Sequence, residues 1–231
     1  MTGAGGAIGA SVAGELARRG RRLVLVDSDA SALGAVAEHG VPMQADLTSD
    51  EEVSELVRRT VAEVGVPTAC VNAAGIEGPV APVEELALEE VARVYDVNVF
   101  AIFRTLRALL PHFKRHGSGR VVNIASGAGL GGVAYMSAYS SSKHAVVGIT
   151  RSVAAEVAAD NVSVNAVCPG CVESPMMARI EGRLAASFRD AIPMRRYAEP
   201  SEVAGIVAYL ICDAPPYLTG ASLVVDGGLR A

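Results

Sequence analysis

The chain has 231 residues, a length that suits one α/β domain and is short for two. Hydrophobic residues make up 51% of it and aromatic residues only 4%, so we expect a core of small aliphatic side chains. A net charge of −5 with scattered basic residues argues against nucleic acid as a partner, and no apolar run reaches the roughly 18 residues of a membrane span. No signal peptide is recognisable, so a cytoplasmic protein is expected.

The first motif along the chain is TGAGGAIG at residues 2–9, which leads directly into a helical pattern. Glycines let a backbone turn tightly against a pyrophosphate at a helix N-terminus. Asp27 ends the next strand-like run, where its carboxylate can accept hydrogen bonds from both ribose hydroxyls and would repel a 2′-phosphate. Because Ser28 stands beside it and the turn holds no basic residue, the sequence predicts NAD rather than NADP. Asp46 and Leu47 could border the adenine, or Asp46 could cap the next helix.

Short apolar runs alternate with amphipathic helical patterns along the whole chain. The strand candidates are 21–27, 40–46, 68–75, 119–126, 161–170 and 221–228. The helix candidates are Ala7 to Arg19, Ala30 to His39, Asp50 to Val64, Leu88 to His116, Ser137 to Ala159 and Ser201 to Cys212. This alternation predicts a Rossmann-like, doubly wound parallel sheet in a three-layer αβα arrangement, as a single domain over residues 1–231. Ligands of such sheets bind at the carboxyl ends of the strands.

Tyr139 and Lys143 lie four residues apart in YSSSK, and therefore on one face of a helix. An ammonium ~4 Å from a phenol, at an effective dielectric constant of ~20, would lower a tyrosine pKa by up to about 3 units. A tyrosine of lowered pKa can exchange a proton with an alcohol or carbonyl oxygen. Ser126, at the end of RVVNIAS, would bind that same oxygen.

The segment from Ser174 to Tyr197 is a long connection that holds SPMM, a short helix-like AASFRDA and IPMRR. Connections of this length are often functional, so we predict a substrate lid over residues 174–197, with an ordinary surface helix as the alternative. The CPGC string at Cys168 and Cys171 is also found in redox proteins, but here it ends a strand candidate. No cluster of residues has metal-ligand spacing, so no metal is expected.

Taken together, these motifs closely resemble the short-chain dehydrogenase/reductase family over essentially the whole chain. The match includes the glycine turn, NAAG at 72–75, Asn98 in YDVNV, the Ser126, Tyr139 and Lys143 set, PGCVES at 169–174, and YLTG followed by VDGG. Ala7 stands where the family more often has glycine, and Ser174 where it has threonine.

The resemblance implies Asn98, Ser126, Tyr139 and Lys143 as the catalytic residues. Tyr139 would act as general acid/base in hydride transfer between NAD(H) and a secondary alcohol or ketone. Lys143 would also bind the nicotinamide ribose, and Asn98 would kink its helix and hold a water on a proton path. The cofactor contacts implied by residue type and position are Gly3, Gly6, Ile8, Gly9, Asp27, Asp46, Leu47, Asn72, Ala73, Gly75, Tyr139, Lys143, Pro169, Gly170, Val172 and Ser174.

One feature departs from the family pattern. The family has an apolar central strand immediately before the glycine turn, whereas this chain begins with Met1 and Thr2. We therefore expect the natural polypeptide to start several residues earlier, with Met1 standing where a strand valine would be.

The predicted substrate pocket is apolar and uncharged. Its lining candidates are Ser126, Ala128, Leu130, Met136, Tyr139, Cys171, Met176, Met177 and Ile180. They favour a neutral secondary alcohol or ketone of modest size, cyclic ones included. Glu77, just after NAAGI, is expected to be an exposed loop carboxylate, with contact to substrate as the alternative.

Two other functions remain open at this stage. One is an NADPH-dependent 3-oxoacyl-[acyl-carrier-protein] reductase of the same family, which Asp27 and the acidic charge disfavour. The other is a catalytically silent nucleotide-binding protein, which the intact Asn-Ser-Tyr-Lys set disfavours. The long apolar helices and the family's habit of assembling through them predict a homo-oligomer, a dimer or tetramer.

Overall fold

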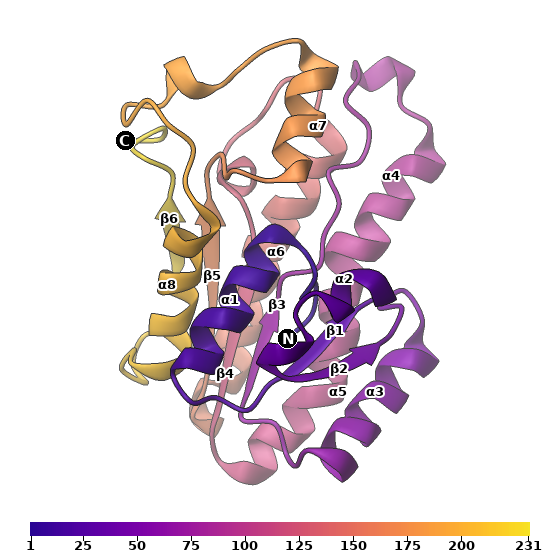
Figure 1. Cartoon of the computed structure of the whole chain (residues 1–231), viewed down its shortest axis with the longest axis vertical. Helices are drawn as coiled ribbons and strands as arrows, with labels where there is room; N and C mark the ends of the chain where they lie inside the picture. The colour runs from indigo at the N-terminus through magenta and orange to yellow at the C-terminus, as the bar shows by residue number, and fades with distance from the viewer.

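Parallel strands form the middle layer of the structure, a computed structural model that describes residues 1–231 (Figure 1). They are β1 (Val24–Asp27), β2 (Val41–Gln44), β3 (Ala69–Asn72), β4 (Gly119–Ile124), β5 (Val162–Pro169) and β6 (Ser222–Val225). Strands β3, β4, β5 and β6 are hydrogen-bonded in that order, and β1 pairs with β2. Every pairing is parallel, as the strand and helix alternation predicts.

Helices cover both faces of this layer, so the doubly wound, Rossmann-like α/β architecture in one domain is confirmed (Figure 1). The helices are α1 (Ala7–Arg18), α2 (Ala30–Gly34), α3 (Asp50–Glu63), α4 (Leu88–Tyr95), α5 (Ala101–His116), α6 (Ser137–Val157), α7 (Pro175–Leu184) and α8 (Pro200–Cys212). Helices α1 and α8 pack together on one face, and α3, α5 and α6 cover the other. None of them is long and apolar enough to cross a membrane.

The two faces of β5 show how the sequence builds the core. Val162, Val164 and Ala166 lie in the buried cluster with α5 and α6, whereas Val167 lies in the cluster with α1 and α8. All eight residues of β5 are buried. A strand covered on both faces is mostly apolar, and the two polar residues of β5, Ser163 and Asn165, are buried as well.

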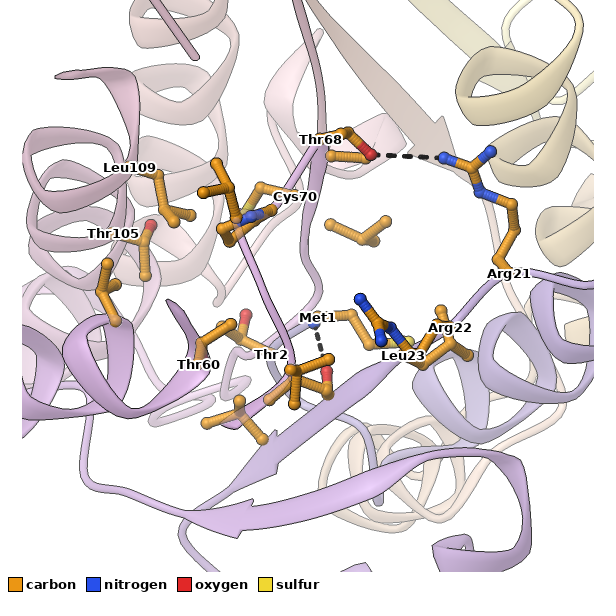
Figure 2. A pocket seen from close by; sticks show the side chains of 18 of the residues that line it. Met1, Thr2, Arg21, Arg22, Leu23, Thr60, Thr68, Cys70, Thr105 and Leu109 are labelled. Carbon is orange, nitrogen blue, oxygen red and sulfur yellow. Dashed lines mark hydrogen bonds between the residues drawn. The ribbon is translucent and has the colours of Figure 1, made fainter. Parts of the chain in front are cut away.

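The first residues of the chain lie between β1 and β3, beside the cavity in Figure 2. Thr2 forms isolated bridges to Val26 and Asn72. Its N–H donates to the Val71 carbonyl at 2.9 Å, and the Met1 ammonium donates to the Val24 carbonyl at 2.6 Å. Beside these residues is a cavity of about 360 Å³, across which Arg21 reaches Thr68 at 3.4 Å. Two separate ladders are thus joined by the first residues of the chain, with Met1 and Ala4 bonded to β1 and Thr2 bonded to β3.

The structure differs from the predicted elements in three places. The helix predicted from Ala30 to His39 ends at Gly34, and a 3-10 turn, Ala37–His39, follows it. The helix predicted from Leu88 to His116 is interrupted by a π-helical turn at Asp96–Phe100, which separates α4 from α5. In the predicted lid, the helix is α7, and the expectation of a helix over AASFRDA is wrong because Ala185, with φ +48°, ends α7 there. Only a 3-10 turn, Arg189–Ala191, follows in that stretch. Ser174 caps α7 by accepting from the Met177 N–H at 3.1 Å.

Candidate active site

A cavity of about 210 Å³ lies at the carboxyl ends of β4 and β5, with α7 above it (Figure 1). Ser126, which follows β4, lines this cavity together with Tyr139 and Lys143 from the first turns of α6. Ser126 follows β4, and Tyr139 and Lys143 lie on α6 at the helical spacing that the sequence predicts. The structure therefore brings the predicted reacting groups together.

Lys143 is almost fully buried beside Tyr139. Its Nζ lies 5.7 Å from the centroid of the tyrosine ring and donates to the Ile124 carbonyl at 2.9 Å. Burial lowers the pKa of this amine to about 8, and the influence of Cys168 opposes the shift only in part.

The pKa of Tyr139 is raised above its ordinary value, so the sequence-based expectation of a lowered pKa is wrong in this structure. Burial is the largest cause, the side chain of Ser126 acts in the opposite direction, and the carboxylate of Glu77 raises the pKa further. Desolvation of the phenolate therefore outweighs the help that the neighbouring lysine was expected to give.

Ser126 is oriented by its own loop. Its Oγ accepts a hydrogen bond from the Ala128 N–H at 3.1 Å. With an acceptor position of the hydroxyl occupied in this way, its hydrogen can be donated to an oxygen in the cavity.

Asn98 lies in the π-helical turn and is fully buried. Its Oδ1 accepts from the Ile76 N–H at 2.8 Å, while its Nδ2 donates to the Ile76 carbonyl at 2.9 Å and to Ser142 at 3.0 Å. A Cβ on Gly75 would lie 3.2 Å from Asn98 Oδ1 and 3.4 Å from Lys143 Nζ. The absence of a side chain at Gly75 therefore keeps the space between the asparagine and the lysine open.

The glycine turn leaves room for a phosphate group at the start of α1. A Cβ on Gly9 would lie 1.9 Å from the Gly3 carbonyl oxygen, so only glycine allows the helix and the turn to approach so closely. The N-cap residue of α1, Gly6, makes no side-chain cap bond, which leaves the amides of the first turn available to an anion. Asp27 ends β1 and accepts from the Gly5 N–H at 3.0 Å and the Asp29 N–H at 3.2 Å.

Three of the predicted cofactor residues are held by contacts within the protein. Asp46 accepts from the N–H and the hydroxyl of Thr48, which holds its pKa below the usual range, and Ser49 rather than Asp46 caps α3. Leu47 is buried in the core. The Asn72 side chain donates to Asn123 at 2.8 Å and so ties β3 to β4 rather than entering the cavity.

The other predicted contacts converge on the cavity. Its walls include the predicted residues Ile8, Ala73, Gly75, Ser126, Ala128, Met136, Tyr139, Lys143, Pro169, Gly170, Cys171, Val172, Ser174, Met176, Met177 and Ile180. The glycines of the turn and Asp27 at the end of β1 lie outside these walls, and the whole arrangement fits a dinucleotide as the class of ligand.

Sequence reasoning missed part of the wall and misplaced two residues. Leu130 packs against the core rather than lining the cavity. Glu77 is buried, whereas an exposed carboxylate was expected. The missed wall residues are Ile124, Ala125, Gly127, Val133, Phe188, Asp226, Leu229 and Arg230. The place of Phe188, Leu229 and Arg230 depends on how the lid and the C-terminal segment fold over the strand ends.

The cysteines show no redox arrangement. All four are free, and burial raises the pKa of Cys171 to about 11 and that of Cys168 above its ordinary value. A raised pKa disfavours the reactive thiolate. No group of three or more His, Cys, Asp or Glu side chains is placed to hold a metal ion.

The protein-family model described as Enoyl-(Acyl carrier protein) reductase matches residues 3–230. The chain belongs to the short-chain dehydrogenase/reductase family. It is 36% identical to the cis-4-hydroxycyclohexanecarboxylate dehydrogenase of Sinomonas cyclohexanicum, in an alignment that covers 100% of this chain and 95% of that protein.

Solved structures of the same fold carry nicotinamide cofactors of both kinds. An NAD+-bound xylitol dehydrogenase superposes with a TM-score of 0.93 at 33% identity, covering 98% of this chain and 96% of that one. A variant of the actinorhodin polyketide ketoreductase with NADPH gives a TM-score of 0.95 at 34% identity, covering 99% and 95%. The family relationship thus supports an oxidoreductase with a nicotinamide cofactor.

Proposed function

We propose that this chain transfers a hydride between NAD(H) and a neutral secondary alcohol or ketone, with Tyr139 as general acid/base. The observation that carries the proposal is the convergence of Ser126, Tyr139 and Lys143 on one cavity at the carboxyl ends of β4 and β5. This chain is 36% identical, over its whole length, to the cis-4-hydroxycyclohexanecarboxylate dehydrogenase. The name of that relative describes the oxidation of a ring alcohol, which supports the same reaction class.

The side chains have distinct roles in this reaction. Ser126 donates its hydroxyl hydrogen to the reacting oxygen and orients it, and Tyr139 takes the hydroxyl proton during oxidation or returns it during reduction. Lys143, held by the Ile124 carbonyl, keeps two donors for the ribose of the cofactor. When bound, an oxidised nicotinamide supplies the hydride acceptor and a positive charge that favours the phenolate of Tyr139. Asn98, fixed on Ile76, lies on the path by which protons leave Lys143.

The preference for NAD rests on Asp27. Its carboxylate stands at the end of β1 beside the glycine turn, bonded to the Gly5 N–H, and no basic side chain accompanies it. A 2′-phosphate there would meet a like charge, which typically costs several kcal/mol. Because the similar polyketide ketoreductase structure carries NADPH, the cofactor preference of this chain has to be measured.

The cavity walls favour a neutral substrate, since 15 of the 24 lining residues are hydrophobic. One observation supports a second candidate, a ring alcohol that carries a carboxylate. Arg230 lines the cavity, and its Nη2 approaches the Gly131 carbonyl at 3.5 Å. An exposed guanidinium in this position could pair with a carboxylate at the cavity mouth.

We also propose that the protein is cytoplasmic and forms a homodimer or homotetramer. Phe100, at the end of the π-helical turn, is 49% exposed, and Phe103 on α5 is 50% exposed; both border a surface hollow whose lining includes Val153 of α6. Large apolar side chains at a surface often mark a contact with another subunit. Light scattering of the purified chain measures the assembly.

The test is a turnover assay with NAD+ and NADP+ on cyclohexanol, an acyclic secondary alcohol and 4-hydroxycyclohexanecarboxylate. We expect NAD+-dependent oxidation of neutral alcohols. In Asp27→Ser the affinity for NADH should fall by about 10- to 100-fold, because hydrogen bonds to a charged group contribute ~1.5–3 kcal/mol. Preference for NADPH in the unaltered chain would favour the carrier-protein reductase alternative, and binding without any turnover would favour the silent nucleotide-binding protein.

A further inference from the structure

The loop after β3 forms an ion pair with the lid, in which the Glu77 side chain is buried and the Arg179 side chain is half-exposed. The Glu77 carboxylate, whose side chain is only 8% exposed, accepts from Arg179 Nε at 2.6 Å and from Arg179 Nη2 at 3.2 Å. One helical turn further along α7, Arg183 Nη1 donates to the Gly78 carbonyl at 2.8 Å. Two successive turns of α7 therefore clasp residues 77 and 78, which lie about a hundred positions earlier in the chain.

This ion pair lies next to the proposed catalytic groups. The residue before Glu77 is Ile76, whose N–H and carbonyl are both bonded to Asn98. The field of the Glu77 carboxylate reaches Tyr139 and disfavours its phenolate. Arg179 is the group that offsets the charge of this carboxylate in part. Burial alone would raise the pKa of Glu77, but Arg179 and the backbone outweigh burial and keep the pKa below its usual range.

Few polar or titratable groups surround Tyr139 and Glu77. Ser126 at the end of β4 and Lys143 on the same helix lie beside Tyr139, and the charge of Glu77 on the β3 loop acts on it. Glu77 is influenced by Arg179 and Arg183 of α7. The other titratable groups nearby are Cys171 after β5, Glu181 of α7, which is bonded to the Tyr197 hydroxyl, and Asp226 and Arg230, which line the same cavity as Tyr139.

We propose that the Glu77–Arg179 ion pair latches α7 over the cavity and makes the charge that faces Tyr139 depend on lid closure. With α7 seated, Arg179 offsets the charge of the carboxylate in part, and the remaining field still disfavours the phenolate of Tyr139. With α7 lifted, the carboxylate acts on Tyr139 unopposed and the tyrosine becomes harder to ionise. Glu77 and Arg179 are thus positioning residues that tie proton transfer to closure, and the inference rests on the proposed role of Tyr139.

The test compares Arg179→Gln with the double variant Arg179→Gln/Glu77→Gln. In Arg179→Gln, we expect the pH at which kcat/KM for alcohol oxidation reaches half its plateau to rise by about half to one unit. At pH values below the midpoint, kcat/KM of Arg179→Gln should be about three- to tenfold lower than that of the unaltered chain. The double variant, which lacks the carboxylate as well, should return the midpoint to the original value or bring it lower.

A matched control uses another ion pair of the same segment. Glu173→Gln removes the partner of Arg189, a pair at 2.8 Å in which both side chains are more than half exposed. This variant should leave the pH midpoint unchanged. A midpoint that also moves in Glu173→Gln, or that stays fixed in Arg179→Gln, would overturn the electrostatic role of the latch.

Hydrogen exchange measures the latch without any turnover. Arg179→Gln should speed amide exchange in residues 175–184 while exchange in β4 and β5 stays the same. Unchanged exchange in α7 would overturn the latch. If the unaltered chain oxidises no alcohol, the proposed function fails, and the exchange result still decides whether the ion pair holds α7 down.

Discussion

The two halves of the sheet differ in how extensively their strands are paired. The four-stranded half, β3 to β6, has continuous ladders of four, six and four paired residues, and helices cover both of its faces. The two-stranded half, β1 and β2, has no continuous ladder to it and is bonded to it through residues 1–4, beside a cavity of about 360 Å³. The proposed reacting groups stand on the stronger half, whereas Asp27 stands on the weaker one. Local opening should therefore affect adenosine binding before it affects the catalytic side chains.

The largest expected effect separates chemistry from binding. Tyr139→Phe removes the proposed acid/base from the four-stranded half and should lower kcat by about 10²- to 10⁴-fold. NADH affinity, followed by nicotinamide fluorescence, should change little, because the glycine turn and Asp27 lie elsewhere. Tyr135→Phe, a change at a side chain that is 54% exposed, is the control and should keep its activity. Equal losses in the two variants would contradict the role of Tyr139.

A smaller effect is expected at the junction itself. Thr2→Pro removes the N–H that donates to Val71, a bond of 2.9 Å, and should weaken NADH binding about 2- to 10-fold. Hydrogen exchange should become faster in β1 and β2 while β4 and β5 remain protected. Thr2→Val keeps the N–H and a β-branched side chain, so it should behave as the unaltered chain does. Faster exchange across all strands would show that the two halves unfold together.

The sequence predicted the features that rest on local pattern. The strands and long helices follow from apolar periodicity, and YSSSK places Tyr139 and Lys143 on one face because helical spacing alone decides it. The glycine turn was readable for the same reason, since only glycine allows Gly9 to approach Gly3 so closely.

Other features depend on contacts between distant segments. Glu77 is buried because Arg179, 102 positions away, folds over it, and no spacing in the sequence announces that pair. The pKa of Tyr139 was predicted in the wrong direction because its burial is a property of the assembled core. The start of α7 was missed although Ser174 and Pro175 are an N-cap and first-turn signal, since AASFRDA offered a competing local pattern.

The last expected effect is on stability and concerns the cost of burying Lys143 within the four-stranded half. Its pKa falls from 10.5 to about 8 on folding, so between these values the unfolded chain holds a proton that the folded chain has released. Stability rises with pH wherever the unfolded state binds more protons. Relative to Lys143→Met, the unaltered chain should therefore gain up to about 1.4 kcal/mol per pH unit in that window, and nothing below it.

Urea unfolding at several pH values between about 7 and 10 measures this difference. Lys114→Met, at the only other lysine of the sequence, controls for the loss of one positive charge from the surface. A constant difference between the unaltered chain and Lys143→Met across the window would mean that Lys143 keeps its proton when buried. In that case the lysine would remain a permanent positive charge beside Tyr139, and the four-stranded half would hold a charged group whose cost is offset by the Ile124 carbonyl.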